Sequence, residues 1–175
     1  MEKLLKTRRL LLRPLGTGDL ETVHAYASVR ENCLYMMHCP NDSREETLGF
    51  LRAAEAEWQK ERPGFYEFAV TLEGCQIGAV SVYPDEAGES GELGWILHRD
   101  YWGQGYALEA AEAVRDFALG ELGLRRLTAH CDARNTGSFR IMEKLGMTRA
   151  EGVGVRRNRA FPGEDAPELT YILNR

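Results

Sequence analysis

The chain has 175 residues, 43% of them hydrophobic, with a formal net charge of −5 and a sequence pI near 5.5. The length suits one domain with a sizeable core. The acidic balance argues against a nucleic-acid binder, which would need surplus Lys and Arg to neutralise phosphates. No apolar run approaches the ~18 residues of a membrane helix, and the N-terminus lacks a secretory signal. We therefore expect a single domain over residues 1–175 in the cytoplasm, bound to neither nucleic acid nor membrane.

The four cysteines, Cys33, Cys39, Cys75 and Cys131, are scattered and form no Cys-x-x-Cys pair. This usage is typical of thiols in a reducing compartment. Cys33, His38 and Cys39 are close enough in sequence to raise the question of a metal site, but no second ligand pair accompanies them. We therefore expect no metal.

Strand-like and helical patterns alternate through the first half of the chain. Leucines at 10–12 lie between arginines in a run that stops at Pro14, as expected for a first strand. Ser43 followed by Glu46 is a capping-box signature for a helix. We expect a strand over residues 7–15, a helix over 20–27 capped by Asp19, an irregular, substrate-facing segment over 30–42, and a helix from Ser43 to before Pro63.

The second half begins with a run of period two over residues 65–83, which Glu73-Gly74 divides into an antiparallel hairpin. Gly146 is suited to the left-handed position that ends a helix. The remaining expected elements are strands over 91–97 and 126–131, helices over 107–119 and 139–145, a strand that begins near Met147 and continues through Val153 and Val155, and a final strand over 168–173 that pairs with it.

The stretch from Glu92 to Ala107 runs from a strand through Gly103-x-Gly105 into a helix. The first turn of a helix has N–H groups without intrahelical partners, its dipole adds partial positive charge, and glycines let a phosphate come close. The sequence therefore predicts a ligand that carries phosphate. It contains no Gly-Lys-Ser/Thr of a nucleotide P-loop, and Leu108 occupies the third-glycine position of a dinucleotide fingerprint.

Residues 102–107, Trp-Gly-Gln-Gly-Tyr-Ala, resemble the pyrophosphate loop of the GNAT superfamily of acetyl-CoA-dependent N-acetyltransferases, except that Trp102 replaces its Gln or Arg. The Tyr-Trp-Gly-x-Gly-Tyr-Ala form is similar to the Rim-type branch of ribosomal-protein N-terminal acetyltransferases. Residues 135–147 resemble a second family motif, Asn-x-x-Ser followed by Glu-Lys-Leu-Gly. The resemblance implies an α/β (α+β) GNAT fold, a mixed sheet of about seven strands with about four helices, in which the fourth and fifth strands splay apart after a bulge.

The same resemblance implies where acetyl-CoA binds. The pantetheine arm would lie in the gap between strands 91–97 and 126–131, where splaying leaves main-chain groups unpaired. The expected cofactor-binding residues are Ile96, Leu97 and His98 through their main chain, Trp102, Gly103, Gln104, Gly105, Tyr106 and Ala107 at the pyrophosphate, and Asn135 and Ser138 in the second motif.

Acetyl transfer requires a neutral amine, so a base must remove a proton. Glu92 is the expected base, although a solvated strand carboxylate is an equal alternative. Main-chain N–H groups around Trp95 to Leu97 could stabilise the oxyanion. Met142 stands where many relatives have a proton-donating tyrosine, so Ser138 is expected to serve the departing thiolate unless it only caps its helix.

Other polar residues have simpler interpretations. His130 is expected to be structural, and His98 is expected beside the cofactor without acting as base. The basic run at 156–159 could recognise an acidic acceptor or the cofactor's 3′-phosphate, or form a solvated hairpin edge. The predicted function is acetyl transfer to a primary amine, first a protein N-terminus, by a monomer or homodimer. The alternatives are a small-molecule amine, such as an amino acid, polyamine or aminoglycoside, and a non-catalytic acyl-CoA-binding module.

Overall fold

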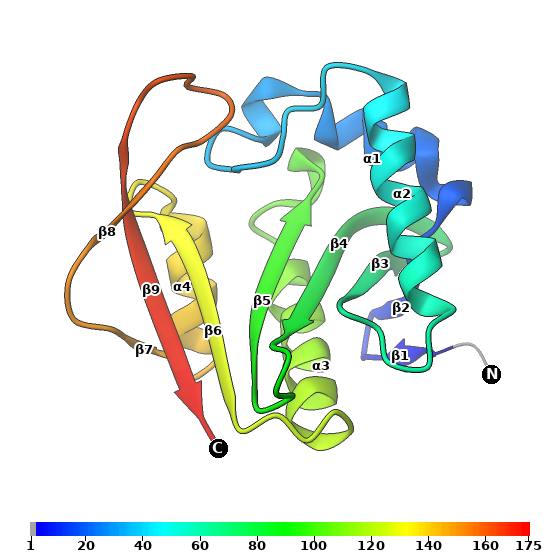
Figure 1. Cartoon of the computed structure of the whole chain (residues 1–175). Coiled ribbons are helices and arrows are strands. Elements are labelled where there is room, and N and C mark those ends of the chain that lie inside the picture. The colour runs from blue at the N-terminus through cyan, green and yellow to red at the C-terminus, as the bar shows by residue number, and fades with distance from the viewer. Residues whose placement is uncertain (1–2) are drawn as a thin grey trace.

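The computed structural model describes residues 3–175, whose strands form one mixed sheet with helices on both faces (Figure 1). The strands are β1 (Leu5–Lys6), β2 (Leu10–Pro14), β3 (Tyr66–Leu72), β4 (Cys75–Pro84), β5 (Ser90–Leu97), β6 (Arg126–Asp132), β7 (Thr148–Arg149), β8 (Gly154–Arg156) and β9 (Ala166–Asn174). The helices are α1 (Leu20–Ala27), α2 (Arg44–Trp58), α3 (Tyr106–Gly120) and α4 (Thr136–Lys144), with 3-10 turns at Thr17–Asp19, Arg30–Asn32 and Arg99–Tyr101. No helix within the described range is long and apolar enough to cross a bilayer.

The sheet order is β1-β2-β3-β4-β5-β6-β9-β7, and β8 also pairs with β9. The expected mixed α/β fold is confirmed, but there are nine strands rather than about seven. One addition is β1, which pairs with β2 at the sheet edge. The other arises because the strand expected from Met147 is divided. Gly152 has a φ of 87°, which turns the chain between β7 and β8, and both pieces pair with β9 as the terminal hairpin requires.

The caps of two helices differ from expectation. Asp19 is the N-cap residue of α1, as expected, but its side chain makes no capping bond, because its carboxylate binds Arg13 at 2.6 Å and accepts the Gly16 N–H at 3.2 Å. The last helix, α4, begins three residues before the expected Phe139 and is capped by Asn135, whose Oδ1 accepts the Ser138 N–H at 3.2 Å. The sequence analysis missed the early start because Thr136 and Gly137 are poor helix formers.

The sheet separates two apolar layers, so both faces of its central strands are covered. On one face, α3 and α4 pack against β5, β6 and β9 around Val114, Leu127 and Met142. On the other face, α1 and α2 pack over β3 and β4 around Leu51 and Ala69 (Figure 1). We call the first face the α3 face and the second the α1 face.

The parallel pairing of β5 with β6 stops early. It joins Ser90 to Arg126, Gly91 to Leu127 and Glu92 to Thr128, while β5 continues to Leu97 and β6 to Asp132. The expected splay is therefore present, between the fifth and sixth strands because β1 adds one to the count. The expected bulge is not in β5, since β4 pairs with β5 in unbroken register; the irregularity lies between Val70 and Thr71 of β3.

Candidate active site

The turn before α3 has the geometry of an anion site. Gly103 and Gly105 have φ values of 74° and 81°, a left-handed region that glycine adopts without strain. The first intrahelical bond joins the Glu109 N–H to Gly105 O at 3.1 Å. The N–H groups of residues 106–108 therefore precede the helical ladder and have no partner four residues earlier. We therefore add Leu108, through its main-chain N–H, to the expected phosphate-binding residues.

The sequence analysis missed Arg9, which lies beside this turn. Its guanidinium donates to Gln104 O at 3.1 Å, pairs with Glu109 at 2.6 Å and lies over the Tyr106 ring at 4.4 Å from the centroid. Glu109 in the first turn of α3 holds this arginine in place. No local motif marks Arg9, because it directly precedes β2 and lies 95 residues before Gln104 in the chain. It brings guanidinium donors beside the glycines, with its charge balanced by Glu109.

The main-chain groups that border the gap alternate along β5. The His98 N–H donates to Ile77 O of β4 at 2.8 Å, so it is not available to a ligand in the gap. Main-chain N–H and C=O groups of successive residues point to opposite sides of a strand. The main-chain groups of Ile96 therefore also point to β4, whereas those of Trp95 and Leu97 point into the gap. Leu97 O accepts from the Asn32 amide at 3.0 Å and from the Trp102 indole at 2.9 Å. The geometry therefore favours Trp95, and the Leu97 N–H, over the expected Ile96 and His98.

Trp102 has a positioning role in this arrangement. Its indole N–H binds the end of β5 while its side chain stays 53% exposed. This bond ties the glycine turn to the strand that borders the gap. The expected contact of Trp102 with the cofactor stays a prediction.

The start of α4 lies on the α3 face beyond the last residue pair of β5 and β6. Asn135 caps the helix, so Ser138 is in its first turn and the alternative that Ser138 is the cap is wrong. The Ser138 hydroxyl contacts the Cys131 thiol, and the pKa of that thiol is raised to about 11 by burial despite this contact and the nearby Arg156. Met142 is 1% exposed and packs in the core. Its thioether has no proton to donate.

Glu92 lies at the last residue pair before the gap opens, between Tyr83 of β4 and Thr128 of β6. It is exposed and makes no ion pair within the described range. Its position suits a base, and its exposure also fits a solvated strand carboxylate. The structure leaves both predictions in place.

A second carboxylate, Glu67 of β3, lies on the same α1 face and is only 6% exposed. It accepts a hydrogen bond from the Tyr83 hydroxyl at 3.2 Å and another from Ser81. Burial raises the pKa of Glu67 to about 7, although these two hydroxyls oppose the rise. The period-two pattern of β3 marks Glu67 only as a residue on its polar side.

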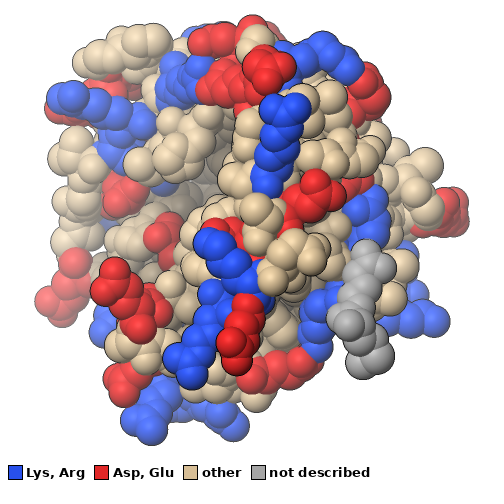
Figure 2. All heavy atoms as spheres, turned by 45° about the vertical axis from the view of Figure 1, so that its right-hand side comes forward, with Lys and Arg blue, Asp and Glu red and all other residues tan. Residues whose placement is uncertain are grey.

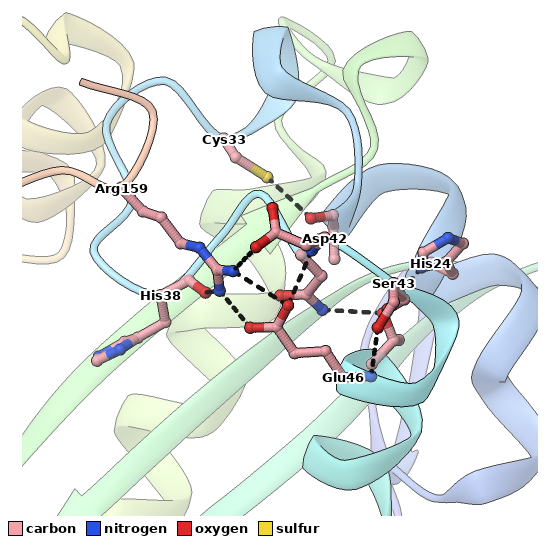
Figure 3. A network of polar contacts seen from close by, with 10 residues as sticks. His24, Cys33, His38, Asp42, Ser43, Glu46 and Arg159 are labelled. Carbon is pink, nitrogen blue, oxygen red and sulfur yellow. Dashed lines mark hydrogen bonds and ion pairs between the residues drawn. The ribbon is translucent and has the colours of Figure 1, made fainter. Parts of the chain in front are cut away.

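Two loops meet over the wide end of the gap. Segment 30–42 follows α1, and loop 157–165 joins β8 to β9 on the other half of the sheet (Figure 1). Arg159 donates from its main-chain N–H to Met36 O at 3.0 Å, and its guanidinium binds Asp42 at 2.6 Å and also Glu46 (Figure 3). Arg30 donates to Ala160 O at 3.1 Å. We call these contacts the loop bridge.

The basic run at 156–159 is engaged within the protein. Arg156 is 8% exposed and donates to Tyr35 O at 3.1 Å and to Asn158 at 3.0 Å. Arg157 pairs with Asp165 within its own loop at 2.7 Å. Arg156 and Arg159 therefore connect this half of the sheet to segment 30–42, whereas Arg157 stays exposed and is paired within its own loop.

A family model described as an acetyltransferase (GNAT) domain matches residues 9–148. The chain belongs to the GNAT acetyltransferase family. The uncharacterized N-acetyltransferase YnaD of Bacillus subtilis (strain 168) is 31% identical over 147 residues, which are 82% of this chain and 81% of YnaD. The expected family is thereby confirmed, and this GNAT protein is an acetyl-CoA-dependent acyltransferase.

Two solved structures share the fold of this GNAT chain. RimL, a ribosomal L7/L12 alpha-N-protein acetyltransferase, superposes with a TM-score of 0.83 at 16% identity and covers 100% of this chain and 96% of its own. Spermidine N-acetyltransferase from Vibrio cholerae, in complex with CoA and spermine, has a TM-score of 0.80 at 21% identity over 95% of each chain. At these identities the likeness shows the fold alone, so the Rim-type branch stays a prediction.

The GNAT site fits acetyl-CoA by two independent features. The turn over residues 103–107 and the first N–H groups of α3 suit a diphosphate, and the strand edges beyond Glu92 and Thr128 suit an extended amide chain. Two surface cavities, of about 420 Å³ beside β7 and 660 Å³ between β2 and α2, are not lined by β5 or α3. They are separate from the gap.

Charged groups elsewhere on this GNAT protein form no single patch on the face that Figure 2 shows, where Lys and Arg alternate with Asp and Glu around a hollow. Among residues 3–175, no three His, Cys, Asp or Glu side chains are arranged to hold a metal. Cys33 donates instead to Tyr26 O at 3.4 Å. His130 binds Thr170 at 3.0 Å, which suits its expected structural role.

Proposed function

We propose that this acyltransferase is an N-acetyltransferase that moves the acetyl group of acetyl-CoA to a primary amine. The observation that carries the proposal is the end of β5–β6 pairing at Glu92 and Thr128, on a strand that leads directly into the glycine turn of α3. A thioester placed in that gap would be open to attack from the α1 face. The proposal keeps the cytoplasm as the location and a monomer or homodimer as the assembly.

The chain supplies the groups that such a transfer needs. Main-chain N–H groups of Trp95 and Leu97 on the gap side of β5 suit the oxyanion. The Ser138 hydroxyl, in the first turn of α4, suits the departing thiolate, and Glu92 suits the removal of a proton from the amine. The cofactor supplies the acetyl group as a thioester.

The first candidate acceptor is a protein N-terminal α-amine. The motif over residues 101–107 supports it, and so does the shared fold of RimL. The second candidate is a polyamine, which two observations favour: Glu67 and Glu92 on the α1 face make no ion pair within the described chain, and the spermidine N-acetyltransferase shares the fold. A cationic amine suits both carboxylates.

Thiol release from acetyl-CoA measures the proposed activity directly. The acceptors to compare are a peptide with a free N-terminus, the same peptide with a blocked N-terminus and one lysine, and spermidine. We expect turnover of the first or third and none of the lysine peptide. Turnover of small amines alone would overturn the proposal that the acceptor is a protein N-terminus. Tight CoA binding without transfer to any amine would overturn the N-acetyltransferase and leave an acyl-CoA-binding module.

Ser138→Ala tests the role of the hydroxyl. We expect kcat to fall about tenfold to a hundredfold while CoA affinity stays the same, because the hydroxyl acts on the departing thiolate rather than on the bound state. Thr136→Ala, at an exposed site in the same turn of α4, is the matched control. An unchanged kcat in Ser138→Ala would remove Ser138 from the reaction.

A further inference from the structure

Glu67 is an unusual residue in this core. A carboxylate is costly to bury unless a cation or several donors compensate its charge. No ion pair to Glu67 occurs within residues 3–175, and its side-chain contacts are the two hydroxyls of Ser81 and Tyr83. The neighbouring Arg13 of β2 is turned towards Asp19 at 2.6 Å. The fold therefore keeps a carboxylate that lowers its stability, which is common at functional sites.

The position of Glu67 connects it to the gap. Residues directly opposite each other in adjacent strands share a face, and Glu67 lies opposite Ser81, which lies opposite Gly94. Gly94 is two residues beyond Glu92, where pairing with β6 ends, so this row reaches the opening of the gap. Strands lie about 4.8 Å apart, which puts Glu67 roughly 10 Å from Gly94 along the row. One hydroxyl lies between them.

The glycine at position 94 keeps the end of this row open. A Cβ at Gly94 would lie 2.9 Å from the Ser81 Oγ, too close for any other residue unless Ser81 moved. The Ser81 hydroxyl therefore lies above the Gly94 backbone, where a side chain on β5 would otherwise stand. A small polar group that enters the gap from the α1 face can reach this hydroxyl without meeting a β5 side chain.

With the cofactor site on the α3 face, the α1 face is the side left for the acceptor. The glycine turn, the start of α3 and Ser138 all lie on the α3 face, so the cofactor groups bound there occupy that side. The other titratable groups around Glu67 are Tyr83 on β4, Tyr26 on α1 and, beside Tyr83, Glu92 on β5. Burial raises the pKa of both tyrosines, so neither tyrosine loses its proton near neutral pH, whereas burial brings the pKa of Glu67 to about 7.

We propose that Glu67, acting through the Ser81 hydroxyl, accepts the proton that the acceptor ammonium releases before it attacks the thioester. The inference rests on the proposed N-acetyltransferase function and assigns Glu67 as a positioning residue in it. Glu67 takes one proton from the ammonium, and the neutral nitrogen then forms the C–N bond as the C–S bond breaks. The second proton leaves with the thiol, and Glu67 returns its proton to water. In this assignment Glu67 replaces Glu92 as the base, and Glu92 attracts the cationic acceptor.

The burial of Glu67 fits this role. Its pKa of about 7 lets the carboxyl bind and release a proton near neutrality, where an ordinary glutamate stays ionised. Activity should therefore rise with pH through this value, because only the carboxylate can accept the proton.

The test compares Glu67→Gln, Glu92→Gln and Ser81→Ala in the full chain, with an amine found by thiol release. We expect the parent kcat/KM to rise with pH through an apparent pKa near 7. In Glu67→Gln, kcat/KM should lose that pH dependence and fall about a hundredfold at pH ~7.5. Glu92→Gln should instead raise KM for the amine and keep the pH profile of the parent. In Ser81→Ala, kcat/KM should fall about tenfold. The double variant of Ser81→Ala and Glu67→Gln should have the same kcat/KM as Glu67→Gln alone, because both residues act in one step.

Glutamine keeps the shape of Glu67, and its amide can accept from one hydroxyl and donate to the other, so unchanged CoA affinity by calorimetry would show an intact site. The inference is overturned if Glu67→Gln stays within threefold of the parent, or if Glu92→Gln removes the pH dependence instead. In either case the parent still acetylates the amine, so the proposed function stands. A parent that binds CoA and transfers to no amine overturns both.

Discussion

Gly105 gives the turn before α3 its form at the level of a single residue. Its φ of 81° disfavours any side chain, and a Cβ there would lie 3.4 Å from the Arg9 guanidinium. Gly105→Val should weaken CoA binding at least tenfold, because the branched side chain would strain the turn and occupy the space of the phosphates. Calorimetry with CoA measures this loss.

Gly120→Ala is the matched control for that experiment. Gly120 is the last residue of α3 and has open space around it, so alanine should leave CoA affinity unchanged. CoA affinity of Gly105→Val within threefold of the parent would contradict the assignment of the turn.

The buried carboxyl of Glu67 should make the stability of the protein depend on pH. Its pKa rises from 4.5 to about 7 on folding, so the folded state holds a proton that the unfolded chain releases between these values. The stabilisation from Glu67 is thus complete below pH ~4.5 and is lost as pH rises through about 7, a change of roughly 3 kcal/mol.

Chemical denaturation across this pH range measures that loss. Relative to the parent, Glu67→Gln should gain roughly 3 kcal/mol in the free energy of unfolding between pH ~4.5 and ~8. The exposed Glu92→Gln should follow the parent throughout. A constant difference between Glu67→Gln and the parent would show that Glu67 titrates normally.

The sequence predicts some of these residues and not others. Gly103 and Gly105 were predictable because a motif specifies their backbone conformation. Glu67 was not, because alternation along β3 marks it as a polar-face residue, and its burial depends on β4 and on the helices of the α1 face. Arg9 was missed for a similar reason, since it meets the glycine turn only in the folded chain.

Among the elements, the loop bridge restricts access to the gap. Arg159 joins loop 157–165 to segment 30–42 through Met36 and Asp42, and to the start of α2 through Glu46. Figure 3 shows its contacts with Asp42 and Glu46. Arg159→Ala should raise KM for the amine several-fold, because both loops border the α1 side of the gap. It should leave CoA affinity unchanged, because the phosphates bind at α3. Steady-state kinetics and calorimetry separate the two effects.

Arg157→Ala is the control for the loop bridge. Arg157 belongs to the same loop and pairs with Asp165 within it, so its loss removes a charge without opening the bridge. Equal effects of the two variants on KM for the amine would show that charge, and not the contact between the loops, sets access.

Element types followed from periodicity, whereas element ends and contacts between loops depended on tertiary structure. The hairpin turn at Glu73-Gly74 was predictable because a glycine stands between two runs of period two. Both turn residues have positive φ, of 49° and 85°. The division of β7 from β8 and the early start of α4 were not, since each depends on pairing or capping that the pattern alone leaves open. Segment 30–42 was expected to face the substrate, but its partner loop could not be identified.

At the scale of the molecule, we propose that residues 1–175 fold as one domain in which the sheet divides at a single place. The halves β1–β5 and β6–β9 stay joined by three residue pairs at one end and by the loop bridge at the other. Two motifs in the expected order were enough to predict this architecture. The splay itself follows from the family resemblance, because no local pattern reports that two strands stop pairing.

A crystal structure of the complex with acetyl-CoA tests the central claim most directly. We expect the diphosphate at the main-chain N–H groups of residues 103–108 and the pantetheine between β5 and β6 beyond Glu92 and Thr128, with the thioester open to the α1 face. A closed gap, or a cofactor bound away from the start of α3, would contradict the account.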